Sequence, residues 1–131
     1  MNCCLKIKDI EVVILCGGKG RRLMPLVKDR PKGLVEINGK PFLDILIDYL
    51  ANFGFKRFVL CIGYLGQNIK QHYQNNHSSL KILFSEEKKP LGTAGAVKNA
   101  ELLIKSNPFL VLNGDSFCRI NLHEFINFYI R

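Results

Sequence analysis

The segment VVILCGGKGRRL, residues 12–23, constrains the fold more than any other part of this chain. An apolar, β-branched run passes directly into a loop that holds Gly17, Gly18 and Gly20. Glycines let backbone N–H groups approach a ligand closely, and successive amides beside cations suit a polyphosphate. The segment therefore predicts a strand at 11–16 that leads into a phosphate-binding loop. The alternative is an ordinary tight turn between a strand and a helix.

Two well-known phosphate loops nearly match this segment but do not fit it. A Walker loop needs Gly-Lys followed by Ser or Thr, whereas Gly20 is followed by Arg21. The dinucleotide fingerprint GxGxxG would begin at Gly18, but position 23 is Leu. The loop therefore indicates a nucleotide by its glycines and cations, without a match to either motif.

Positive charge is concentrated directly after this loop. The net charge is +8, and six cations lie within residues 19–32 against the single acid Asp29. RNA-binding surfaces usually carry exposed aromatic residues among their cations, and residues 19–32 contain none. We therefore expect a compact polyphosphate rather than a nucleic acid as partner; a solvated basic face is the alternative.

Length and composition indicate one globular domain at residues 1–131, because 131 residues with 47% hydrophobic content can bury a core. The cysteine count is five, an odd number without a CxxC pair, which favours a reducing compartment. The sequence shows no signal-peptide pattern and no apolar run long enough to cross a bilayer, so we expect a cytoplasmic protein without a membrane partner. The three histidines are scattered, and we expect solvated or capping roles for them: His72, His77 and His123.

Apolar strand-like runs alternate with helical patterns along the chain. We expect strands near 11–16, 58–62, 80–84 and 109–112, and helices near 41–52, 66–75, 93–105 and from Leu122 to the end, with a turn at Asn38-Gly39. This alternation predicts an α/β, doubly wound, Rossmann-like and mostly parallel sheet. Right-handed crossovers give the strand order 3-2-1-4, which places the Gly17 loop and Asp115 at one crevice.

Three further features could carry chemistry. Asp115 follows a buried strand and could hold Mg²⁺ beside bound phosphates, or simply form a turn; no second suitable aspartate is evident, since Asp44 and Asp48 lie on a helix and are expected to be solvated. Lys32 could neutralise a second anionic group, or be a loop lysine. Glu87 with the glycine-rich helix start at 90–96 could recognise a base, and a carboxylate acceptor suits guanine; the alternative is a capped helix packed on the sheet.

Together these motifs resemble those of the sugar-phosphate nucleotidyltransferases. The family pattern LAGGxGTRL corresponds to LCGGKGRRL at 15–23, its PK to residues 31–32 and its GD to residues 114–115. The PLGTAGA run and NGKPFL at 38–43 are most similar to guanylyltransferases acting on heptose 1-phosphate or mannose 1-phosphate. The resemblance covers roughly residues 11–121 and corresponds to the N-terminal, nucleotide-binding half of that family.

The resemblance implies a reaction and a role for each matching residue. A sugar 1-phosphate and a nucleoside triphosphate would give a nucleotide sugar and pyrophosphate, with Mg²⁺ as cofactor, in nucleotide-sugar biosynthesis for a surface polysaccharide or lipopolysaccharide. Arg22 and Lys32 would be catalytic, and Asp115 would hold the metal. The residues that would bind the nucleotide are Leu15, Gly17, Gly18, Gly20, Arg21, Glu87, Gly92 and Thr93.

The chain departs from the family pattern at three points. Arg21 stands where the family has Thr, Lys89 stands where relatives often have an acid, and the chain lacks the half that supplies sugar contacts and a second metal-binding aspartate. We therefore expect a truncated version of the fold. Two alternatives stay open: a sugar- or choline-phosphate nucleotidyltransferase that uses CTP, UTP or dTTP, and a non-catalytic nucleotide-binding module. A homo-oligomer is also compatible with the sequence.

Overall fold

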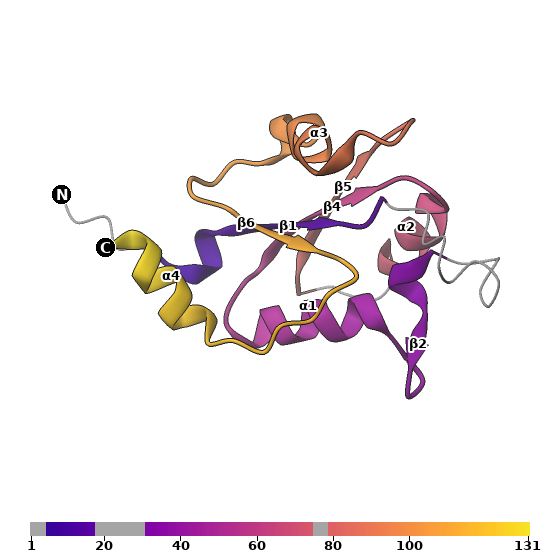
Figure 1. Cartoon of the computed structure of the whole chain (residues 1–131). Coiled ribbons are helices and arrows are strands. Elements are labelled where there is room, and N and C mark those ends of the chain that lie inside the picture. Colours follow the sequence, from indigo (N-terminus) through magenta and orange to yellow (C-terminus); the bar gives the residue numbers. More distant parts are fainter. Residues whose placement is uncertain (1–4, 18–30, 75–78) are drawn as a thin grey trace.

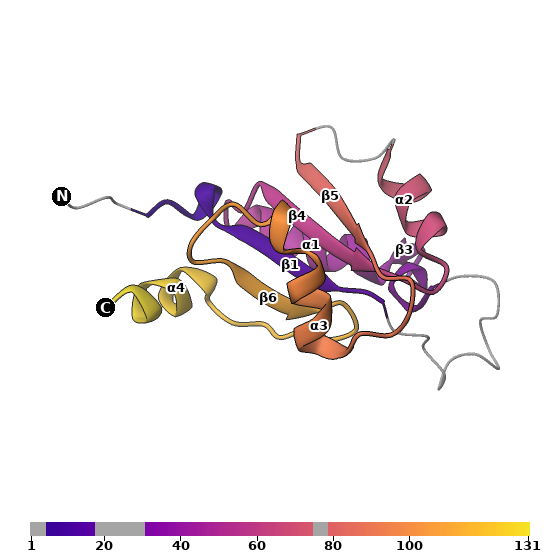
Figure 2. The same ribbon diagram turned by 90° about the horizontal axis from the view of Figure 1, so that it is seen from above.

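A computed structural model describes residues 5–17, 31–74 and 79–131 of the chain. Its centre is a parallel sheet of four strands in the order β5-β4-β1-β6 (Figures 1 and 2). The strands are β1 (Glu11–Leu15), β4 (Arg57–Ile62), β5 (Lys81–Glu86) and β6 (Leu110–Asn113). Numbered along the chain, this is the predicted order 3-2-1-4, so the expected α/β fold is confirmed.

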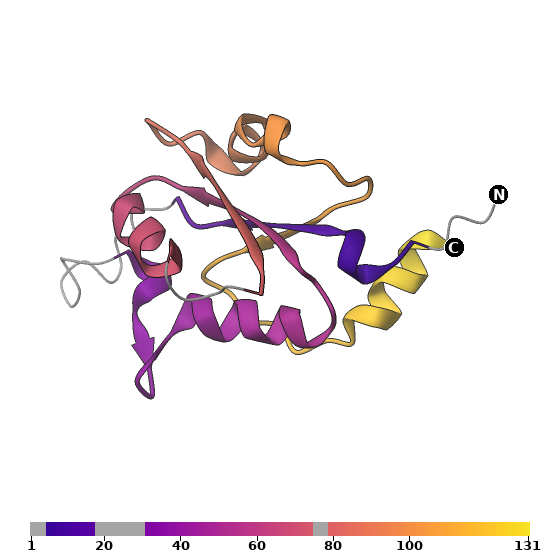
Figure 3. The same ribbon diagram turned by 180° about the vertical axis from the view of Figure 1, so that it is seen from behind.

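Helices cover both faces of the sheet, as expected for parallel strands joined by crossovers. They are α1 (Phe42–Asn52), α2 (Gly66–Gln74), α3 (Gly92–Asn99) and α4 (Leu122–Ile130), with short 3-10 turns at Ile7–Asp9, Lys32–Leu34 and Glu101–Leu103. Figures 1 and 3 show α1 and α3 on opposite faces. Among the described residues, no helix is long and apolar enough to cross a membrane.

The helix predicted over 93–105 is too long. α3 ends at Asn99, the backbone breaks at Ala100, and only a 3-10 turn follows. The side-chain amide of Asn99 donates to the carbonyl oxygen of Glu86 at 2.9 Å, which ties the helix end to β5. This tertiary contact stops a helix that the spacing of small and apolar residues would otherwise continue.

The main core lies between the sheet and α1. Large side chains such as Ile47, Phe55 and Phe58 are at most 1% exposed there. A smaller cluster lies under α3, where Ala96 and Ala100 let the helix approach Val13 and Val59 closely. The sheet is thus held by a thick layer of large side chains on one face and a thin layer of small ones on the other.

A short hairpin leads the chain into α1. Strands β2 (Glu36–Ile37) and β3 (Lys40–Pro41) pair antiparallel around the predicted Asn38-Gly39 turn. Asn38 has φ +52° and Gly39 φ +79°, the pair of positive values that a two-residue hairpin turn requires. The turn prediction is therefore confirmed.

A buried carboxylate ties the amino end of β1 to the segment that precedes β6. Glu11 is only 2% exposed, and its Oε1 accepts hydrogen bonds from the backbone N–H groups of Lys105 at 2.7 Å and Ser106 at 3.0 Å. The backbone N–H of Glu11 in turn donates to Ser106 Oγ at 2.9 Å. These bonds anchor the start of β6 beside β1, so the opposite, carboxyl ends of both strands emerge together.

Candidate functional site

The carboxyl ends of the four sheet strands meet at one edge of the sheet. The Gly114 N–H donates to the Leu15 carbonyl oxygen at 2.9 Å, which joins the ends of β6 and β1. The Glu87 N–H donates to the Ile62 carbonyl oxygen, also at 2.9 Å, which joins β5 and β4. The predicted neighbourhood of the first and fourth strands is confirmed, and this edge is where doubly wound folds bind ligands.

The side chain of Glu87 is held between two glycines of this edge. A Cβ atom on Gly17 would lie 2.2 Å from Glu87 Oε1, and one on Gly63 would lie 3.0 Å from the same atom. Glu87 Oε2 accepts a hydrogen bond from the Leu91 N–H at 3.3 Å, just before α3. Glu87 thus lies against the loops after β1 and β4 and next to the start of α3, which brings two of the predicted nucleotide-binding residues together.

Gly63 is a part of this arrangement that the sequence analysis missed. It follows the buried strand β4 just as Gly17 follows β1. Its hypothetical Cβ would also lie 3.2 Å from the Gly17 carbonyl oxygen, closer than most real contacts of that kind. The glycine immediately after a fully apolar strand was the available signal.

The start of α3 lies in the same neighbourhood as Glu87. The helix begins at Gly92, which has φ +73°, a value that favours glycine. Gly92 and Thr93 are both exposed, so their backbone groups can be reached from solvent. The local geometry agrees with the prediction that the PLGTAGA run opens a helix next to Glu87.

Asp115 lies at the same edge, directly after the tightly packed Gly114. A Cβ on Gly114 would meet the Leu15 carbonyl oxygen at 3.0 Å and Cys16 Sγ at 3.1 Å. Asp115 is exposed, and its Oδ1 accepts a hydrogen bond from Ser116 Oγ at 3.2 Å. Burial, followed by the charges of Cys61 and Asp115, raises the pKa of the Cys16 thiol well above its usual range, so this thiol stays neutral.

The donor set at Asp115 limits which metal it could hold. Within residues 5–17, 31–74 and 79–131, no three His, Cys, Asp or Glu side chains form a metal-binding group. Mg²⁺ is commonly bound through one or two carboxylates together with substrate phosphates and water. A single exposed carboxylate beside a phosphate-binding loop fits that mode, whereas a cage made only of protein ligands does not form among the described residues.

Several predicted site residues lie outside the described part of the chain. They are Gly18, Gly20, Arg21 and Arg22. The backbone of Lys32 begins a 3-10 turn, but its side chain is also outside the description. Their roles therefore stay predictions.

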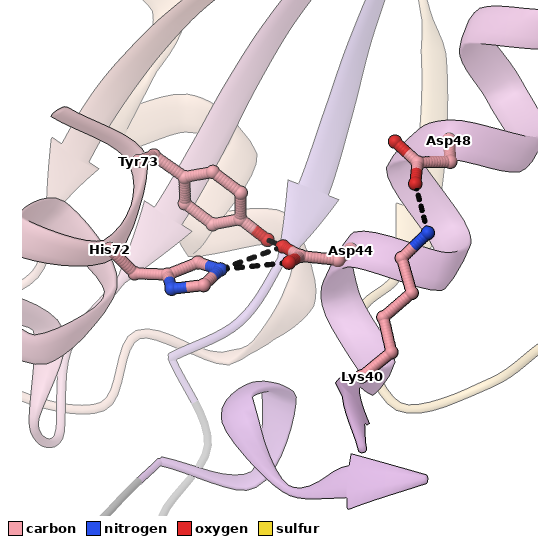
Figure 4. Close-up of polar contacts among 5 residues, drawn as sticks. All are labelled: Lys40, Asp44, Asp48, His72 and Tyr73. Atoms are coloured by element: carbon pink, nitrogen blue, oxygen red, sulfur yellow. Dashed lines mark hydrogen bonds and ion pairs between the residues drawn. The ribbon is translucent and has the colours of Figure 1, made fainter. Parts of the chain in front are cut away.

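A carboxylate-centred cluster joins α1 to α2 and corrects two expectations (Figure 4). His72 Nε2 lies 2.9 Å from both oxygens of Asp44, and Tyr73 donates its hydroxyl hydrogen to Asp44 Oδ1 at 2.7 Å. Asp44 is only 13% exposed, so neither it nor His72 is a simple solvated side chain. Asp48, by contrast, is 43% exposed and pairs with Lys40, as expected for a solvated acid.

The chain matches the family model described as nucleotidyl transferase over residues 11–131. This chain belongs to the nucleotidyl transferase family. It is 42% identical over 115 residues to D-glycero-alpha-D-manno-heptose 1-phosphate guanylyltransferase of Campylobacter jejuni, which covers 88% of this chain and 52% of that protein. It is 34% identical over 117 residues to UTP--glucose-1-phosphate uridylyltransferase AglF of Haloferax volcanii, covering 89% of this chain and 48% of that protein.

The fold of this nucleotidyl transferase chain is also similar to solved structures. The crystal structure of HddC from Yersinia pseudotuberculosis complexed with GMP-PN has 40% sequence identity and a TM-score of 0.81, and the match covers 92% of this chain and 54% of that one. The inositol-1-phosphate CTP transferase from T. maritima has 26% identity and a TM-score of 0.73, with 82% of this chain and 44% of that one covered. The chain thus spans about half the length of the relatives it matches.

Proposed function

We propose that this chain forms the nucleotide-binding part of a guanylyltransferase that acts on a sugar 1-phosphate of the heptose class. The observation that carries the proposal is the position of Glu87, held against Gly17 and Gly63 at the carboxyl edge of the sheet. A carboxylate accepts the hydrogens that guanine offers on N1 and N2. The identities to a heptose 1-phosphate guanylyltransferase and to HddC with bound GMP-PN support the same base and substrate class.

In the proposed reaction, an oxygen of the sugar 1-phosphate attacks the α-phosphorus of GTP. The bond between the α-phosphorus and its bridging oxygen breaks, and pyrophosphate leaves with the electron pair. The attacking oxygen is already an anion, so the site needs to neutralise charge and align the groups rather than supply a nucleophile. In the proposal, Arg22 stabilises the departing pyrophosphate and Lys32 the α-phosphate or sugar phosphate.

Mg²⁺ is part of the proposal as a neutralising ion between the triphosphate and Asp115. When bound, the ion offsets the charge that accumulates on the phosphate oxygens. Asp115 supplies one exposed carboxylate beside the end of β1, and the phosphates supply the other charged oxygens. Asp115→Asn should therefore remove the Mg²⁺ dependence of GTP binding. Asp9→Asn, an exposed acid outside the candidate site, should leave that dependence unchanged.

The base is tested by comparing GTP, ATP, CTP and UTP in calorimetric titrations with Mg²⁺. GTP should bind at least about tenfold more tightly than the others, because a lost hydrogen bond to a charged acceptor costs roughly 1.5–3 kcal/mol. Glu87→Gln should narrow that preference, while Glu86→Gln, the exposed neighbouring acid that pairs with Lys70, should preserve it. Equal binding of all four nucleotides would contradict the guanine assignment.

Relatives named for UTP and CTP make base choice the sharpest part of this test. A preference for UTP or CTP with the same dependence on Mg²⁺ and Asp115 would keep the reaction class and replace the base. Binding of a nucleotide without pyrophosphate release in the presence of heptose and mannose 1-phosphates would favour a non-catalytic binding module instead.

A further inference from the structure

Exposed apolar side chains gather in one part of the molecule. Across residues 5–17, 31–74 and 79–131, ten large hydrophobic side chains are exposed, and eight of them lie within 109–130. We call these eight the β6–α4 surface: Phe109, Val111, Phe117, Ile120, Phe125, Phe128, Tyr129 and Ile130. Figure 2 shows β6, the connection after it and α4 on the side of the sheet away from β5. Contiguous apolar surface of this kind commonly marks an interaction site.

The strand in this surface has one free edge. β6 is hydrogen-bonded to β1 alone and ends the sheet on its side, within the residues that the structure describes. Val111 is in register with Val13, yet Val13 is fully buried while Val111 is 37% exposed. An unpaired strand edge offers N–H and C=O groups to another strand. The β6 edge is therefore able to accept a further strand.

The helix in this surface is covered on one side only. Leu122 and Ile126, four residues apart, are buried against the core. Phe125 is 49%, Phe128 79% and Tyr129 68% exposed, so the aromatic side chains point away from the same core. The helix thus has a second apolar face that nothing in the described chain covers.

The charge of this region argues about the identity of its partner. Within 109–131, Asp115 and Glu124 balance Arg119 and Arg131, so the region is formally neutral while the whole chain carries +8. A neutral apolar surface is suited to burial against another protein segment. Two copies of the chain would instead bring two net charges of +8 together, which opposes self-association.

The relatives provide a specific candidate for that partner. HddC shares this fold with a TM-score of 0.81, but the match covers only 54% of its chain. We infer that the β6–α4 surface binds the part of the nucleotidyl transferase fold that this chain does not span, by adding a strand beside β6 and covering the aromatic face of α4. This inference goes beyond the proposed reaction, because it concerns a protein contact and requires neither a particular base nor a metal.

The inference is tested by fusing the whole 131-residue chain to the part of the Campylobacter jejuni relative that follows the matched region. A covalent link keeps the two parts at high effective concentration, so moderate mismatch between the sequences is tolerated. Amide hydrogen exchange within 109–130 should slow at least about tenfold in the fusion relative to the chain alone. Exchange in the chain alone is measured at a concentration where light scattering gives the monomer mass of 14.9 kDa.

Matched variants distinguish a specific contact from general stabilisation. Phe128→Ser, at a side chain 79% exposed, should reverse the added protection in the fusion without changing the unfolding of the chain alone. Leu102→Ser, at a side chain 84% exposed and outside the surface, should change neither. Equal exchange in the fusion and the free chain would overturn the inference. A stable dimer of the chain alone, with 109–130 already protected, would assign the surface to a second copy instead.

Both overturning results leave the proposed function separately testable. Nucleotide preference and the effect of Glu87→Gln are measured by titration, and neither measurement depends on where further polypeptide binds. A fusion that protects 109–130 but shows no preference for GTP would keep this inference and contradict the guanine assignment.

Discussion

Strand β4 and helix α4 are both strongly apolar, yet their side chains are covered to opposite extents. In β4 (RFVLCI), five of six residues are buried; in α4 (LHEFINFYI), only Leu122 and Ile126 are. β4 lies between β1 and β5 and under helices on both faces, whereas α4 touches the core with a single stripe. The difference teaches that position in the fold, rather than hydrophobicity, decides which apolar residues contribute stability.

The largest test of this comparison uses the same substitution in both regions. Phe58 in β4 is 1% exposed and Phe128 in α4 is 79% exposed. Phe58→Ala should lower the free energy of unfolding by roughly 3–5 kcal/mol, because it removes buried contacts and leaves a cavity. Phe128→Ala should change it by less than about 0.5 kcal/mol. Urea unfolding measures both, and a large loss with Phe128→Ala would show that its side chain is already covered.

Much of the fold could be predicted because neighbouring signals agreed. Continuous apolar runs marked β1 and β4 as buried strands, Asn38-Gly39 marked the hairpin, and the right-handed crossover rule supplied the strand order. The length of α3 could not be predicted, since the bond from Asn99 to the Glu86 carbonyl joins segments that spacing does not connect. Pattern alone gives elements, whereas contacts between them set where each one ends.

The candidate site shows the same division. Gly17 and Glu87 could be nominated from composition and motif, and the sheet order explains why they meet. The role of Gly63 depends on the path of the Glu87 side chain, and the link between Asp44 and His72 depends on how α1 packs against α2. Both are consequences of packing that a single sequence does not display.

A second test concerns two acids of α1 whose surroundings differ. Asp44 is 13% exposed and bonded to His72 and Tyr73, while Asp48 is 43% exposed and pairs with Lys40 (Figure 4). Asp44→Ala should cost roughly 1–3 kcal/mol of unfolding free energy, because it leaves buried donors without their acceptor. Asp48→Ala should cost less than about 1 kcal/mol.

Thermal and urea unfolding of the two Asp variants give the comparison directly. Asp44→Asn serves as a further control, since it keeps the size of the side chain and one acceptor oxygen while removing the charge. Its loss should fall between those of Asp44→Ala and wild type. Equal losses for Asp44→Ala and Asp48→Ala would mean that the bridge between α1 and α2 contributes no more than a surface ion pair.

The smallest expected effect compares the thiols of Cys61, buried in β4, and Cys118, exposed between β6 and α4. Burial, followed by the charge of Glu87, raises the pKa of Cys61 from 9.0 to about 11. The unfolded chain therefore ionises this thiol before the folded one does. The stability that Cys61 contributes is complete below the unfolded pKa of 9.0 and is lost as pH rises towards about 11.

Urea unfolding at several pH values between these two pKa values should show this loss in wild type and in Cys118→Ala, and a shallower loss in Cys61→Ala. The difference between variants isolates the thiol from the other groups that titrate at alkaline pH. Iodoacetamide with peptide mapping at about pH 8 should label Cys118 and spare Cys61, because the thiolate is the reactive form and needs access. Equal labelling of both thiols would mean that β4 opens as readily as the segment before α4, which contradicts the contrast in cover between the two regions.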